Sequence, residues 1–176
     1  MKKSLILILA VCMLIAMSGP AIVEGSTNVY YYMPYLTTVS GAEVYCMASN
    51  FSTDDVTSTT FAVMASAVSQ APQTARTFPT INNIAKGRTQ QISFIGQTVT
   101  VDGTTQVVDL SSDTGTNSSY GGTLHFSSTG STGINCKTLL MTCFQGNTSP
   151  KRNLVGYICE DDSTSGPGNT KNVIGY

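Results

Sequence analysis

The chain has no tryptophan and one histidine, and only 11% of its 176 residues are charged. Nine lysines and arginines stand against ten aspartates and glutamates, for a net charge of −1, and no basic run is longer than two residues. Nucleic-acid-binding proteins concentrate positive charge to neutralise phosphates. We therefore expect no nucleic-acid partner.

The scarcity of histidine and the spacing of cysteine limit the chemistry that the chain can support. A Ser-His-Asp triad would have to use His125, and no Gly-x-Ser-x-Gly elbow is present. No Cys-x-x-Cys pair suggests a zinc site or haem attachment. A lone histidine in a strand is more often structural than catalytic, so the sequence predicts a non-enzymatic protein with no metal and no other cofactor.

Acidic residues offer only weak alternatives to that prediction. Asp54-Asp55 and Glu160-Asp161-Asp162 could bind calcium through carboxylate oxygens, but neither matches a calcium loop, and solvated charge is the simpler interpretation. A glycosidase would have to use Glu43 and Glu160, the only glutamates after position 25, and neither lies in an apolar pocket signature.

The N-terminus has the layout of a secretory signal peptide. Lys2 and Lys3 precede thirteen apolar residues at 5–17, and small residues follow at 18–25. Thirteen residues fall short of the roughly 20 that a membrane-spanning helix needs, so an uncleaved anchor is disfavoured. We favour cleavage after Gly25 over Ala21, which leaves 151 of the 176 residues as one domain. The expected location is extracellular or cell-surface, with the periplasm as an alternative, and the mature chain should not insert in a membrane.

Four cysteines remain after this cleavage, and an even number in a secreted chain predicts disulfides. Cys136 and Cys143 are seven residues apart, so they would point to opposite faces of a regular strand. Of the three pairings, we favour Cys136–Cys159 with Cys46–Cys143. Buried free thiols are the alternative.

Residues 136–159 carry the clearest structural pattern in the chain. Two apolar runs, 138–144 and 154–158, flank a break rich in turn-forming residues, which predicts a β-hairpin. A pairing centred between Asn147 and Thr148 would place Cys136 opposite Cys159, within reach of a cross-strand disulfide.

Other short runs predict strands along the rest of the mature chain. Asp102-Gly103 suits a two-residue hairpin turn, and residues 57–68 are assigned to a strand although their alanine-rich end is compatible with a helix. A further extended piece is expected near Phe78-Pro79. The other expected strands are residues 29–36, 42–49, 89–95, 97–101, 104–110 and 123–127.

About eight to ten short strands with no convincing helix predict a single all-β sandwich over residues 26–162. The polar C-terminal residues 163–176 are expected to form a flexible tail, unless Val173-Ile174 docks onto the domain.

Three motifs carry a resemblance to a known class of protein. The chain reads Y-Y-Y-M-P-Y-L, then E-V-Y-C-M-A-S-N, then a Lys-Gly turn before T-Q-Q-I-S-F. Over residues 29–161 this order resembles small secreted bacterial immunoglobulin-like β-sandwich modules. The resemblance implies an immunoglobulin-like fold and a location at the surface or in the matrix more than an activity. Chaperone–usher pilins are disfavoured, because their donor-strand mechanism needs an alternating apolar terminal segment and Pro34 interrupts the N-terminal one.

A run of tyrosines supplies the candidate ligand or partner face. In a regular strand Tyr31 and Tyr35 share one face, and Tyr30 and Tyr32 share the other. One face belongs to the core, and the other could present flat rings to a sugar or a protein. Loss of polysaccharide binding in Tyr31→Ala would support a sugar ligand. The triplet at Asn50 is one of three glycosylation sequons, which matter only in a glycosylating host.

The preferred hypothesis is a non-enzymatic extracellular surface or matrix interaction module. The alternatives are a carbohydrate-binding domain that uses the tyrosines, a filament subunit whose edge strand pairs with the next copy, and a small hydrolase centred on His125. The expected partner is accordingly an extracellular protein, a polysaccharide or another copy of the chain.

Overall fold

A computed structural model describes residues 27–64, 75–77, 84–101, 107–112, 114–130, 133–146, 153–162 and 172–174. The expected signal peptide, residues 1–25, lies outside these ranges. The described residues form strands and no helix, so none of them provides a helix of the length and hydropathy needed to cross a membrane. The strands are β1 (Asn28–Thr37), β2 (Val44–Asn50), β3 (Ser58–Met64), β4 (Ala75–Thr77), β5 (Thr89–Ile95), β6 (Thr98–Val101), β7 (Val107–Asp109), β8 (Ser119–Ser127), β9 (Leu139–Gln145), β10 (Asn153–Leu154), β11 (Tyr157–Asp161) and β12 (Asn172–Ile174).

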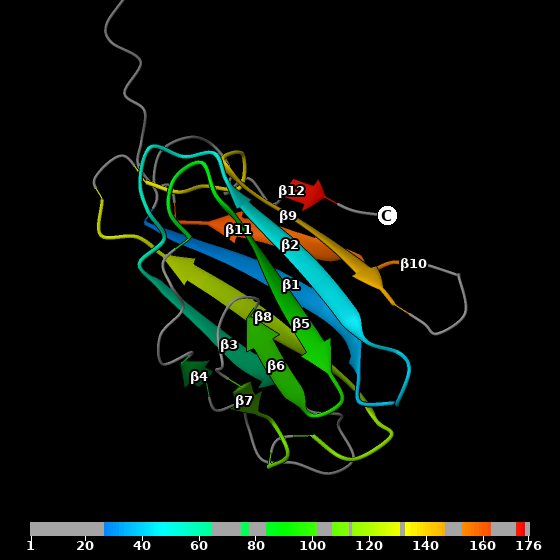
Figure 1. Ribbon diagram of the computed structural model, residues 1–176. Coiled ribbons are helices and arrows are strands. Elements are labelled where there is room, and N and C mark those ends of the chain that lie inside the picture. Colours follow the sequence, from blue (N-terminus) through cyan, green and yellow to red (C-terminus); the bar gives the residue numbers. More distant parts are fainter. Residues whose placement is uncertain are drawn as a thin grey trace, which may run out of the picture.

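These strands form two antiparallel sheets of six strands each (Figure 1). Sheet A has the order β12-β11-β1-β8-β3-β4, and sheet B has the order β10-β9-β2-β5-β6-β7. Burial alternates along the long strands, as in β8 and β2, because successive side chains point to opposite faces. The predicted all-β architecture of two packed sheets is therefore confirmed.

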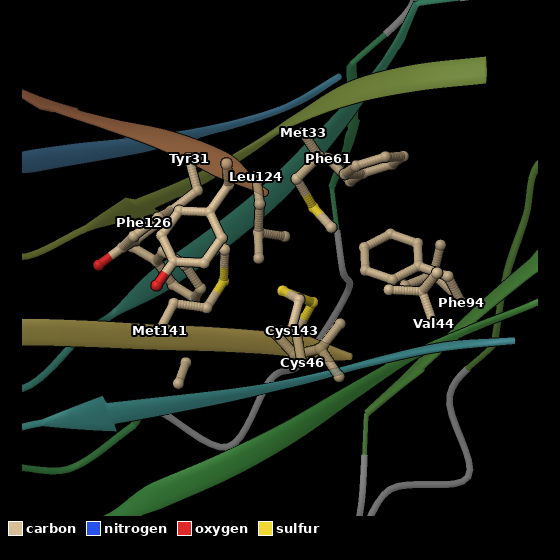
Figure 2. Close-up of a cluster of buried hydrophobic side chains, with 14 of the residues drawn as sticks. Tyr31, Met33, Val44, Cys46, Phe61, Phe94, Leu124, Phe126, Met141 and Cys143 are labelled. Carbon is tan, nitrogen blue, oxygen red and sulfur yellow. A yellow bond between two sulfur atoms is a disulfide. The ribbon is translucent and has the colours of Figure 1, made fainter. Parts of the chain in front are cut away.

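Aromatic and aliphatic side chains from both sheets fill the space between them (Figure 2). Phe61 of sheet A and Phe94 of sheet B are fully buried, with ring centroids 5.1 Å apart. Tyr31 reaches across the core from β1, and its hydroxyl donates a hydrogen bond to the backbone carbonyl of Leu139 in β9. The two sheets are thus joined by packing and by a polar contact.

Two disulfides are present, and they join the pairs that the sequence favoured. Cys46 and Cys143 are direct neighbours on β2 and β9 of sheet B, with Cα atoms 4.1 Å apart. Cys136, which precedes β9, is bonded to Cys159 in β11 of sheet A, with Cα atoms 5.9 Å apart. One bond therefore links strands within a sheet, and the other links the two sheets.

The hairpin expected over residues 136–159 is only partly present. β9 pairs with β10 through Phe144 and Leu154, which centres the pairing on position 149 and not between 147 and 148. β10 has two residues, after which the chain crosses to sheet A and continues as β11 beside β1. The expected cross-strand position of Cys136–Cys159 is therefore wrong. The alternation of apolar residues could not predict that the chain passes from sheet B to sheet A after β10, because strands of both sheets bury one apolar face.

Three other segments refine the expected strand map. β6 and β7 pair antiparallel as predicted, but their register is centred between positions 103 and 104, one residue later than a two-residue Asp102-Gly103 turn requires. The expected turn itself lies outside the described residues. β8 begins at Ser119 within an expected loop, because Tyr120 points into the core. Residues 172–174, which were assigned to a flexible tail, pair with β11 as β12. The extended piece expected within residues 75–84 is present in part as β4, residues 75–77, whereas Phe78-Pro79 itself lies outside the described ranges. Residues 65–68 and the rest of the tail also lie outside them.

Candidate functional site

The four tyrosines of β1 do not share faces as a regular strand would place them. Tyr31 points inward and Tyr32 outward, but the register between β1 and β8 shifts between Met33 and Leu36. This irregularity lies at Pro34, which has no N–H to donate to a neighbouring strand. Beyond it Leu36 is buried, whereas Tyr35 is 47% exposed. The expectation that Tyr31 and Tyr35 share a face is therefore wrong.

Tyr31 is part of the core and cannot contact a ligand. Its side chain is 1% exposed, and its ring packs edge-on against Phe126 and Tyr157 at centroid distances of 5.8 and 5.4 Å. Burial raises the pKa of its hydroxyl far above the ordinary value. A Tyr31→Ala variant would disturb core packing and would not report on ligand binding. Polysaccharide binding should therefore be tested with a substitution of the exposed Tyr32.

Tyr30, Tyr32 and His125 form a column of rings on the outer face of sheet A, the face turned away from the core. Tyr30 is in register with His125 on β8, and their rings are stacked at 4.4 Å with planes 8° apart. The Tyr30 and Tyr32 rings follow at 6.5 Å with planes 20° apart. Tyr32 is the more exposed end of this column.

Both ring nitrogens of His125 have partners within the domain. Asn28 turns its amide nitrogen to Asp162 at 2.6 Å, so its oxygen faces His125 Nε2 at 2.8 Å and accepts a hydrogen bond from it. Nδ1 then carries no hydrogen and lies 3.4 Å from the Thr60 hydroxyl. Burial lowers the pKa of His125, and the Asp162 carboxylate opposes this only in part. These contacts link His125 of β8 to Asn28 of β1 and to Thr60 of β3.

An apolar hollow of about 340 Å³ lies beside the exposed end of the ring column. Three partly exposed side chains flank it: Tyr32 at 37%, Ile158 at 40% and Met64 at 49% exposure. A glycine is required at position 122, because a Cβ there would lie 2.1 Å from Cζ of Phe61. The described residues that line it are Tyr32, Met33, Pro34, Met64, Gly121, Gly122 and Ile158.

Glu160 lies next to this hollow on the same face. β11 places Glu160 in register with Tyr30, and Ile158 in register with Tyr32. The Glu160 carboxylate lies near the Tyr32 hydroxyl, whose pKa is raised by partial burial and by that carboxylate. The four central strands of sheet A, β11, β1, β8 and β3, contain no lysine or arginine. The outer face therefore combines an apolar hollow with a carboxylate.

The other acidic candidates bind backbone N–H groups. Asp161 accepts from Cys136 at 3.0 Å and Asp54 accepts from Gly133 at 2.8 Å. Among the described residues no group of three His, Cys, Asp or Glu side chains could hold a metal ion. Glu43 precedes β2 of sheet B, whereas Glu160 lies on β11 of sheet A.

Asn50 is a buried structural residue and not a surface sequon. Its amide nitrogen donates to the carbonyls of Asp54 and Ile84 at 2.8 Å each. Its oxygen accepts from the backbone N–H and the hydroxyl of Ser52 at 3.0 and 2.6 Å. A glycan therefore cannot be attached here without breaking this network. The sequence indicated a strand end at Asn50 but not its burial.

Sequence reasoning also missed the hollow, although one signal was present. Paired glycines inside a strand, Gly121-Gly122, indicate close approach of other atoms to the backbone. Comparisons with protein-family models, with curated proteins and with solved structures found no match. The interpretation of this face therefore depends on its own geometry.

Proposed function

We propose that this protein is a secreted, non-enzymatic interaction module that binds an extracellular partner through the outer face of sheet A. The observation that carries the proposal is the apolar hollow flanked by Tyr32, Ile158 and Met64. Apolar groups gathered around a concavity on an otherwise hydrated surface are typical of binding sites.

Two disulfides in one small domain support an oxidising, extracellular location. The signal-peptide pattern of residues 1–25 favours the same compartment. We also propose that the sandwich is of immunoglobulin-like type. The support for this is its two antiparallel sheets, the disulfide between them and the three sequence motifs.

The surroundings of His125 support a binding function over hydrolysis. Its Nε2 is held by Asn28, and neither His125 nor Thr60 lines the hollow. A general base must reach the proton that it removes from a bound substrate. His125 holds the first residues of β1 in place and leaves the hollow as the contact site.

A carbohydrate ligand is the second candidate, favoured by the exposed ring of Tyr32 beside the Glu160 carboxylate. A filament subunit is less well supported. The edge strands β4, β7, β10 and β12 have two or three residues each as described, so they offer few backbone groups to a neighbouring copy.

Binding of the fluorescently labelled secreted protein to the surface of the producing cells tests the proposal. We expect saturable binding that Tyr32→Ala lowers at least fivefold, an exposed aromatic contact being worth about 1 kcal/mol or more. Leu140→Ala is the matched control, since Leu140 is 42% exposed on β9 of the opposite sheet. Equal binding by both variants would contradict the proposed face, and a chain retained inside the cell would contradict secretion.

A further inference from the structure

We propose that the hollow and Glu160 together bind a basic protein segment that presents an aliphatic side chain beside a lysine or arginine. The aliphatic group enters the hollow, and the cation pairs with Glu160 and the Tyr32 ring. The inference rests on the proposed function, because it names the partner class of the same face.

The lining of the hollow selects an aliphatic group. Its walls are the ring of Tyr32 and the side chains of Met64 and Ile158, and its glycines contribute no side chains. A volume of about 340 Å³ is at the low end of ligand sites, which suits one inserted side chain. A sugar ring would bring hydroxyls against these apolar walls and lose hydrogen bonds to water there.

The charge beside the hollow selects a cation. Glu160 and Ile158 are two residues apart on β11, so they share the outer face, and β1 places Tyr30 opposite Glu160 and Tyr32 opposite Ile158. The central strands of sheet A supply no lysine or arginine as a counter-ion. A cation placed over the Tyr32 ring and next to the Glu160 carboxylate is stabilised by a cation–π interaction and by an ion pair.

A second copy of the chain is a poorer occupant than such a segment. A symmetric contact brings the same patch of both copies together. Two hollows facing each other would set Glu160 near Glu160, and juxtaposed like charges disfavour a complex. A partner of opposite charge is therefore favoured.

Titration of the ¹⁵N-labelled secreted protein, followed by amide chemical shifts, tests the inference. The probe is acetyl-Gly-Arg-Leu-Arg-Gly-amide. The controls are the same peptide with glutamates for both arginines, the same peptide with glycine for leucine, and cellohexaose. We expect the first probe alone to shift the amides of Tyr32, Gly121 and Ile158, and added salt to weaken its binding.

Two pairs of variants separate the contributions of charge and apolar surface. Glu160→Gln should weaken binding about two- to fivefold, as expected for an exposed ion pair, while Glu43→Gln leaves it unchanged. Ile158→Ser should weaken it at least threefold by removing an apolar wall, while Leu140→Ser leaves it unchanged. Unaltered amide spectra away from each substitution establish that the variants are folded.

Each other outcome overturns the inference in a recognisable way. Equal binding of the acidic peptide excludes the cation, and shifts caused by cellohexaose alone assign the face to carbohydrate. Shifts that grow with protein concentration without any probe assign it to a second copy. Cell binding that depends on Tyr32, without binding of the basic peptide, overturns this inference and leaves the proposed function. If neither Tyr32-dependent cell binding nor binding of the basic peptide is found, both this inference and the proposed function are overturned.

Discussion

Removal of one hydroxyl from each of two buried tyrosines should have opposite effects on stability. Tyr31→Phe keeps the ring against Phe126 and Tyr157 but removes the donor to the Leu139 carbonyl. A hydrogen bond contributes about 1 kcal/mol net, and a buried carbonyl left without a donor costs about 1–3 kcal/mol. We expect the free energy of unfolding to fall by about 2 kcal/mol. Tyr120→Phe removes a buried hydroxyl that has no hydrogen-bond partner among the described residues, so we expect no loss, and a gain of up to about 1 kcal/mol.

Urea unfolding of the oxidised protein, followed by tyrosine fluorescence and circular dichroism, measures both changes. With an m-value of about 2 kcal/mol/M, Tyr31→Phe should lower the midpoint by about 1 M. Tyr120→Phe should leave it unchanged or raise it by about 0.5 M. Equal destabilisation by the two substitutions would refute the argument, because it would assign the effect to ring packing and not to the paired hydroxyl.

Three further perturbations follow from the structure. Replacing both cysteines of Cys46–Cys143, which are 97 residues apart, should lower the free energy of unfolding by about 4.7 kcal/mol, as measured by denaturant unfolding. Replacing both cysteines of Cys136–Cys159, which are 23 residues apart, should lower it by about 3.4 kcal/mol, because the shorter loop restricts the unfolded chain less. A larger loss for the second pair would contradict this loop-entropy argument. Because burial lowers the folded-state pKa of His125, the unfolded chain takes up the proton first. Stability present above the ordinary pKa of 6.5 should therefore be lost as pH falls below it, and His125→Gln should flatten that part of the pH profile. Gly122→Ala should destabilise the fold by about 2 kcal/mol or more, since its Cβ meets the Phe61 ring; a neutral result by thermal unfolding would show that the ring moves aside.

Strands with alternating burial could be predicted because the alternation of apolar and polar residues is a local property of each segment. Val44, Cys46 and Ala48 are buried in β2 while the residues between them are not, and this period of two is visible in the sequence. The assignment of strands to sheets was not visible. Leu154 and Tyr157 lie three residues apart, yet they belong to different sheets, and only packing of the whole chain decides that.

The candidate site could likewise be predicted only in part, because its geometry depends on packing between strands that are far apart in the sequence. The tyrosine run marked β1 as a notable strand, but the face of Tyr35 depends on an irregularity in pairing with a strand about ninety residues later. Burial of Tyr31 followed from its alternation with Val29 and Met33, once the core side was known. The hollow depends on Gly121 of β8 lying between the backbone of Met33 and Pro34 in β1 and the side chain of Met64 in β3, which is a tertiary property.

The contacts of Asp162 have a mechanical consequence. Its carboxylate accepts hydrogen bonds from the N–H groups of Thr27 and Asn28 at 2.8 and 3.0 Å, so the start of β1 and the end of β11 are held together. Because β1 and β11 are antiparallel neighbours, a pulling force applied at these two points would unzip their backbone pairs one after another and not shear them together. Unzipping reaches Cys159 at the third pair, opposite Tyr31, where the bond to Cys136 prevents further peeling of β11. The β1–β11 pair would therefore yield to small forces applied at Thr27 and Asp162, while the disulfide limits how far β11 can separate.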